Sequence, residues 1–106
     1  MARLTEDREL RARYHTMRWA LNMIEEETEN AMDQHRPMAG AHEGYGLLLE
    51  ELDELWDEIK LSKKDDPRLD QMRLEAIQVA AMLVRFIVDV TGRPQGVQES
   101  DPACRL

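Results

Sequence analysis

Hydrophobic residues recur at alternating steps of four and three along the first third of the chain, with polar residues between them. This spacing is typical of one apolar face of a long helix. Thr5 is suited to cap such a helix, and Pro37 disfavours helical geometry at Arg36. The pattern therefore predicts a first helix over about residues 5–35. Its apolar face consists of Leu10, Tyr14, Met17, Leu21, Ile24, Thr28 and Ala31.

Two further helices are expected over about residues 44–63 and 67–91. Asp66 and Pro67 are suited to be the cap and the first residue of the third helix, and Gly92 is a stop signal at its end. The second helix carries one apolar stripe, in which Trp56 is expected to be core. The stripe consists of Tyr45, Leu48, Leu52, Leu55 and Ile59, widened by Leu49 and Trp56.

The third helix is apolar almost all round between Ala76 and Val90. Three helices alone do not provide enough protein to cover such a surface. We therefore expect an all-α protein whose long helices pack in an antiparallel bundle completed by oligomerisation, as a dimer or a tetramer. Residues 1–92 form the single helical domain of this interpretation. Residues 93–106 form an irregular C-terminal tail that carries Cys104, the single cysteine.

The chain of 106 residues has a formal net charge of −8. This balance disfavours binding to nucleic acid or to an anionic membrane surface, and suits cations. The N-terminal residues are charged rather than apolar, and no segment is apolar over the length of a membrane span. We therefore predict a cytoplasmic protein with neither nucleic acid nor membrane as partner.

Acidic residues on the second helix lie at helical spacing beside its apolar stripe. Glu51 and Glu54 are three residues apart and Glu58 follows four later, so the three form one acidic stripe. On the third helix, Glu75 and Gln78 repeat the three-residue spacing. If the two helices pack antiparallel, the two pairs face each other. Carboxylate and amide oxygens suit a hard cation such as Mg²⁺ or Mn²⁺.

An alternative interpretation needs no metal ion. Acidic helix faces are common in soluble proteins, and basic residues such as Lys60 or Arg73 are near enough in sequence to pair with these carboxylates. Spacing alone does not decide between the two interpretations.

Two segments, HEGYGLLLEELDEL at residues 42–55 and EAIQVAAM at residues 75–82, resemble the MazG-like branch of the all-α nucleotide pyrophosphohydrolases. The resemblance spans roughly residues 41–90. It implies an E-x-x-E motif on one helix, an E-x-x-D motif on the next, and Mg²⁺-dependent cleavage of a nucleoside triphosphate to a monophosphate and pyrophosphate. The implied metal ligands are Glu51, Glu54, Glu75 and Gln78, and the implied catalytic residues are Glu51 and Glu54.

The chain departs from this pattern at Gln78, where the second motif has aspartate. The substitution removes one negative charge, although the amide oxygen still ligates a hard cation. Glu50, Glu58 or a carboxylate of another subunit is a nearby replacement.

Basic residues near the motifs are candidates for phosphate contacts. Lys63, Lys64 and Arg85 are placed suitably, and Arg85 has an alternative ion pair with Asp89 four residues later. His42 either touches substrate or has a structural role.

Two functions follow from the sequence. The first is a Mg²⁺-dependent nucleoside triphosphate pyrophosphohydrolase, acting in nucleotide housecleaning. The second is a MazG-like helical oligomer that has lost catalysis and serves as a nucleotide-binding or protein-interaction module. Gln78 is the feature that separates the two. Trp19 either stacks on a base or packs in an oligomer contact.

Overall fold

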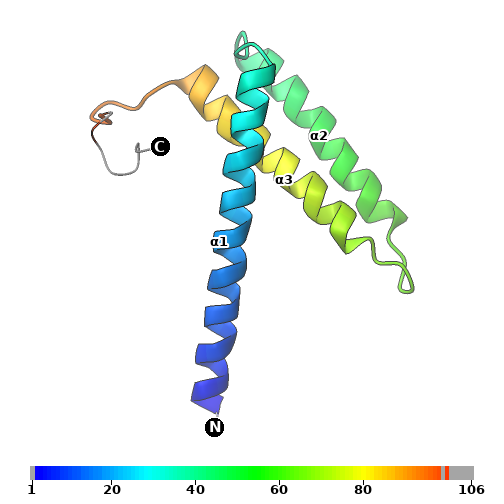
Figure 1. Ribbon diagram of the computed structural model, residues 1–106. Coiled ribbons are helices and arrows are strands. Elements are labelled where there is room, and N and C mark those ends of the chain that lie inside the picture. The colour runs from blue at the N-terminus through cyan, green and yellow to red at the C-terminus, as the bar shows by residue number, and fades with distance from the viewer. Residues whose placement is uncertain (1, 99, 101–106) are drawn as a thin grey trace.

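Three α-helices account for most of the chain in the computed structural model, which describes residues 2–98 and residue 100 (Figure 1). α1 spans Ala2–Gln34, α2 spans Ala41–Leu61 and α3 spans Leu69–Phe86. A π-helical turn, η1 (Ile87–Thr91), continues α3. The fold is all-α, as the sequence predicts. None of the described helices is long and apolar enough to cross a membrane.

The helices form a hairpin and a crossing helix. α2 and α3 run antiparallel side by side, and α1 crosses α3 and projects its N-terminal half away from the hairpin (Figure 1). The molecule measures 49 × 37 × 20 Å along its principal axes. It is therefore extended rather than compact.

The first two helices begin earlier than the sequence predicts. α1 includes Thr5, the expected cap, and α2 begins at Ala41 rather than near residue 44. Part of the predicted tail, including Cys104, lies outside the described residues.

The connection between α2 and α3 shows why α3 begins later than expected. Lys63 and Asp66 exchange two backbone hydrogen bonds, of 2.8 and 3.0 Å, so Asp66 belongs to a tight turn and does not cap the helix. Pro67 lies before the helix rather than at its first position. Arg68 then adopts a left-handed conformation with φ of 52°, and its Nε lies 2.7 Å from Glu58 Oε2 on α2. This ion pair joins the two helices at their connection.

Only part of the apolar stripe predicted for α2 faces the rest of the chain: Leu48 and Leu55 are half-buried, and its other members are exposed. The less exposed positions of α2 include Gly44, Leu48 and Leu55, whereas Trp56 is 54% exposed. The prediction that Trp56 is core was wrong for the single chain. The exposed seam, which lies about a quarter turn round the helix from the packed face, consists of Tyr45, Leu49, Leu52, Trp56 and Ile59.

The apolar face of α1 divides into two parts. Thr28 is buried, and Ile24 and Ala31 are half-buried in the part of α1 that crosses α3. The N-terminal continuation of the same face is exposed because α1 extends beyond the hairpin there (Figure 1). Its exposed members are Leu10, Tyr14, Met17 and Leu21.

Few of the side chains that the structure describes are buried. Among the described residues the buried hydrophobic ones are Met38 and Ala81, and none of the large side chains is fully buried. Apolar burial is the main force that stabilises a folded chain. The contacts within one chain therefore supply little of the core that a stable fold requires.

Gly44 on α2 packs closely against Phe86 of α3. A Cβ atom at this position would lie 2.6 Å from Phe86 Cδ2 and 3.0 Å from Met38 Sδ. Only glycine leaves room for the Phe86 ring against the α2 backbone. Gly44 therefore sets the distance between the two helices at this end of the hairpin.

Replacing Gly44 with alanine should destabilise the fold by about 1–3 kcal/mol, because the new methyl group overlaps the Phe86 ring. Gly46→Ala is the matched control, since nothing lies within 4 Å of its Cβ position, and it should stabilise α2 by about 0.5–1 kcal/mol. Urea unfolding followed by circular dichroism measures both changes. Equal effects of the two substitutions would contradict the close packing at Gly44.

Candidate metal centre

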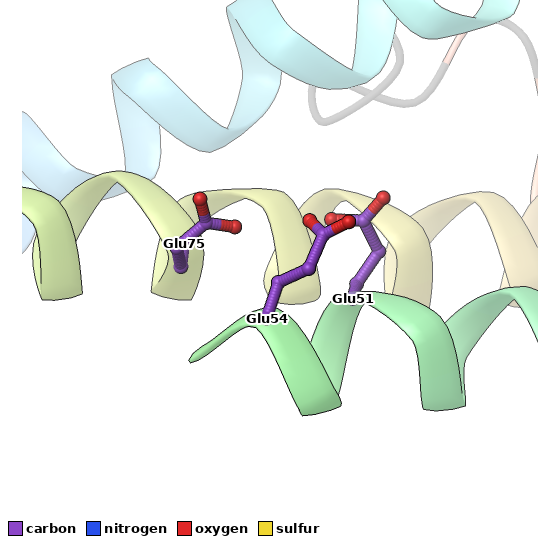
Figure 2. Close-up of side chains that lie close together, drawn as sticks. All are labelled: Glu51, Glu54 and Glu75. Atoms are coloured by element: carbon purple, nitrogen blue, oxygen red, sulfur yellow. The ribbon is translucent and has the colours of Figure 1, made fainter. Parts of the chain in front are cut away.

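Three glutamates from two helices converge between α2 and α3. Glu51 and Glu54 extend from α2 and Glu75 extends from α3 toward the same space (Figure 2). One carboxylate oxygen of each lies within 4.8 Å of the others. We call these three residues the carboxylate triad. The helical spacing within α2 and the antiparallel packing against α3 together produce it.

The charges of the triad repel one another in a partly desolvated place. Glu51 and Glu75 are half-buried, and Glu54 is exposed. Burial raises the pKa of Glu51, and the charges of Glu54 and Glu75 raise it further. Burial likewise raises the pKa of Glu75, with the charges of Glu54 and Glu58 adding to the effect. Full ionisation of the triad is therefore unfavourable without a compensating charge.

Basic side chains do not supply that compensation in the described part of the chain. Lys60 pairs with Asp57 at 3.2 Å, and Arg73 pairs with Asp70 at 2.6 Å. These are the two residues that the metal-free interpretation assigned to the acidic cluster. None of the ion pairs among the described residues includes a member of the triad.

The donor atoms of the triad suit a hard divalent cation. Oxygen ligands at roughly 2.0–2.1 Å from an octahedral Mg²⁺ lie about 3–4 Å from one another. The triad oxygens, within 4.8 Å, need only small side-chain rotations to reach that spacing. Mg²⁺ usually keeps water or phosphate oxygens in its remaining positions, and the exposure of Glu54 leaves the site open to both.

The other candidate ligands are placed differently. Gln78 is half-buried on α3, three residues after Glu75 and so on a neighbouring position of the same face. Glu58 lies on the acidic stripe predicted for α2, but its carboxylate is paired with Arg68. Glu50 is exposed and lies outside the triad. Neither Glu50 nor Glu58 replaces the missing fourth carboxylate in this structure.

A pocket of about 370 Å³ adjoins Glu51 and is lined by residues of the α1–α2 connection, α2 and α3. Of the predicted phosphate contacts only Arg85 lines it. Lys63 and Lys64 are exposed in the α2–α3 connection, and His42 lines a separate apolar pocket. Two basic residues that line it, His35 and Arg36, were not among the phosphate contacts predicted from the sequence. The sequence feature that could have indicated them is their place before Pro37, in the connection between α1 and α2.

The predicted ion pair between Arg85 and Asp89 does not form. Asp89 Oδ2 accepts the backbone N–H of Met38 at 3.0 Å, and the ion pairs of the described chain do not include Arg85. The π-helical turn begins at Ile87, between the two residues, and changes the helical register that the prediction assumed.

Trp19 lies on α1 and is 45% exposed. The guanidinium of Arg73 lies 6.0 Å from the centre of its ring. The two uses predicted for Trp19, base stacking and an oligomer contact, stay predictions.

Comparisons with protein-family models, with curated proteins and with solved structures found no match to this chain. The fold and the site define its class as a three-helix all-α protein with a carboxylate triad between two antiparallel helices. The MazG-like resemblance rests on the residues of the two motif segments alone.

Replacing Glu51 with glutamine should raise the Tm of the metal-free protein at pH 7 by roughly 1–4 °C, because it removes like-charge repulsion. Since the pKa values of Glu51 and Glu75 are raised on folding, their contribution to stability is full below their usual pKa and is lost as the pH rises through the raised values. The advantage of Glu51→Gln should therefore disappear below about pH 4. Thermal denaturation in EDTA measures it.

Asp53→Asn is the matched control, because Asp53 is an exposed carboxylate of the same helix outside the triad. Added Mn²⁺ should raise the Tm of this control and of the native chain, and should have less effect on Glu51→Gln. The same Tm for all three proteins under every condition would contradict repulsion within the triad.

Proposed function

We propose that this chain is a Mg²⁺-dependent nucleoside triphosphate pyrophosphohydrolase, which releases a nucleoside monophosphate and pyrophosphate. The observation that carries the proposal is the convergence of Glu51, Glu54 and Glu75, without a basic partner among the described residues. These are the same residues that match the E-x-x-E motif and the first position of the second motif in the MazG-like resemblance.

The triad and Gln78 would hold the cation, Mg²⁺ or Mn²⁺, through oxygen atoms alone. When bound, the ion would neutralise charge on the phosphoryl oxygens. Glu54, the most exposed member, would orient a water and accept its proton. The water oxygen forms a bond to the α-phosphorus, the bond from that phosphorus to the α–β bridging oxygen breaks, and the bridging oxygen leaves with pyrophosphate. Glu51 and Glu75 would hold the cation, and the reacting phosphate would keep its place through that cation.

Gln78 favours a second candidate function. An amide contributes no charge, so a site with three carboxylates binds a divalent cation less tightly than a site with four. A chain with such a site would act as a nucleotide-binding or protein-interaction module with weak or no catalysis. Cation binding without turnover would distinguish this function from the first.

In either function we propose that the chain assembles with further copies of itself. The exposed seam of α2 has steps of four and three residues, which is the spacing of a helix that packs against another helix. α3 adds the exposed Leu83, and η1 adds the exposed Ile87 and Val88. A second copy is the natural occupant, because a chain with so few buried side chains gains much of its stability by burying these faces.

Pyrophosphate release from a panel of nucleoside triphosphates should require Mg²⁺ or Mn²⁺ and should stop in EDTA. Glu54→Gln should lower the rate by about a hundredfold or more, because it removes the group that accepts the proton of water. Asp53→Asn should keep the native rate. Turnover that ignores metal ions, or that survives Glu54→Gln unchanged, would exclude the proposed reaction.

Analytical ultracentrifugation of the native chain at micromolar concentration should show a species of more than one copy. Leu52→Glu places a charge in the exposed seam of α2 and should lower both the mass and the Tm. Asp53→Asn, on the neighbouring position, should change neither. A native chain that is monomeric and fully folded at these concentrations would refute the proposed assembly.

A further inference from the structure

Arg85 on α3 is buried, and no carboxylate of the described residues forms an ion pair with it. The residue is 5% exposed, and its Nε is buried without a hydrogen-bond partner. Its two Nη atoms reach neutral acceptors only, the Arg36 carbonyl oxygen at 3.4 Å and Met82 Sδ at 3.7 Å. A buried guanidinium without an anion is strongly unfavourable. A negatively charged ligand beside Arg85 would compensate this buried charge.

Two neighbouring acidic residues are engaged elsewhere, and a third, Glu51, lines the same pocket without an ion pair to Arg85. Asp89 accepts the Met38 N–H, and Glu43 binds Arg36 at 2.9 Å and accepts the Ala39 N–H at 3.3 Å. The charge of Arg85 contributes to lowering the pKa of Glu43, after the larger effects of Arg36 and the Ala39 N–H, but no contact joins the two side chains. The guanidinium of Arg85 therefore keeps donors for a ligand in the pocket.

The pocket beside Arg85 has the size and the donors for an anion. Its volume is about 370 Å³, within the range of small-molecule sites. Its wall carries Arg85 and His35, Arg36 with its partner Glu43, and the carboxylate of Glu51. Arginine presents a planar set of N–H donors that matches the oxygens of a phosphate group.

The same pocket also reaches the carboxylate triad. Glu51 lines the pocket and belongs to the triad, so the two sites share one residue. An anion seated between them has to offer oxygens to a cation at one end and to a guanidinium at the other. A chain of condensed phosphates has this distribution of oxygens, whereas a single carboxylate does not.

We propose that the guanidinium of Arg85 binds one phosphate group of a condensed phosphate chain, in a pocket that adjoins the carboxylate triad. The proposal deepens the proposed function and rests on it for the cation, whereas the anion pocket itself rests on the burial of Arg85. The ligand class is a di- or triphosphate moiety. The nucleoside would contribute little to this contact.

Isothermal titration with inorganic pyrophosphate, with and without Mg²⁺, tests the proposal without any turnover. Arg85→Met should weaken pyrophosphate binding about 10- to 100-fold, because charge-assisted hydrogen bonds are lost. It should keep or raise the Tm, since no buried carboxylate loses its partner. Arg73→Met, on an exposed arginine of α3 outside this pocket, should bind pyrophosphate like the native chain.

A measurement on the native chain covers the case in which Arg85→Met fails to fold. The ¹⁵N resonance of Arg85 Nε, whose N–H is buried and unpartnered, should shift when pyrophosphate is added. An unmoved resonance would overturn the proposal, and so would native affinity in a folded Arg85→Met.

Failure of the two proposals can be told apart. If Mn²⁺ does not bind but pyrophosphate still depends on Arg85, the anion pocket stands and the proposed metal-dependent reaction fails. If Mn²⁺ binds and nucleotides are cleaved but Arg85→Met changes neither pyrophosphate affinity nor KM, the anion pocket fails alone.

Discussion

The antiparallel packing of α2 against α3 is the constraint on which the rest of the structure depends. Gly44 lets the Phe86 ring approach the backbone of α2, and the Glu58–Arg68 ion pair joins the helices at the other end of the hairpin. Between these two contacts the hairpin brings Glu51 and Glu54 opposite Glu75 (Figure 2). The same packing that holds the fold together therefore concentrates negative charge where water is partly excluded.

The carboxylate triad and Arg85 carry opposite charges that a single ligand could compensate together. Among the described residues no ion pair includes a member of the triad or Arg85, and an unpaired charge is costly in a half-buried or buried place. Glu51 lies at the point where the two meet. A cation with a phosphate chain would satisfy both, so ligand binding should stabilise the chain more than either component does alone. The scarcity of buried apolar side chains makes such stabilisation important to this protein.

The sequence predicted the helices and the triad because both depend on short-range regularity. Steps of three and four residues locate the helices, and Glu51, Glu54 and Glu75 follow once two such helices pack antiparallel. The packed face of α2 was harder to predict, because the exposed seam of this helix is more hydrophobic than its packed face. For that reason Trp56, which lies on the seam, was expected to be in the core. A pattern within one chain does not distinguish a core face from an exposed apolar seam.

The surroundings of Arg85 depend on tertiary detail that spacing does not encode. The π-helical turn changes the helical register that would place Asp89 beside Arg85, and the Asp89 carboxylate instead accepts the backbone N–H of Met38.

Binding of a divalent cation by the triad is tested most directly by anomalous diffraction from crystals grown with Mn²⁺. We expect one peak at roughly 2.0–2.3 Å from oxygens of Glu51, Glu54 and Glu75. No peak between these side chains in crystals soaked to saturation would contradict the claim.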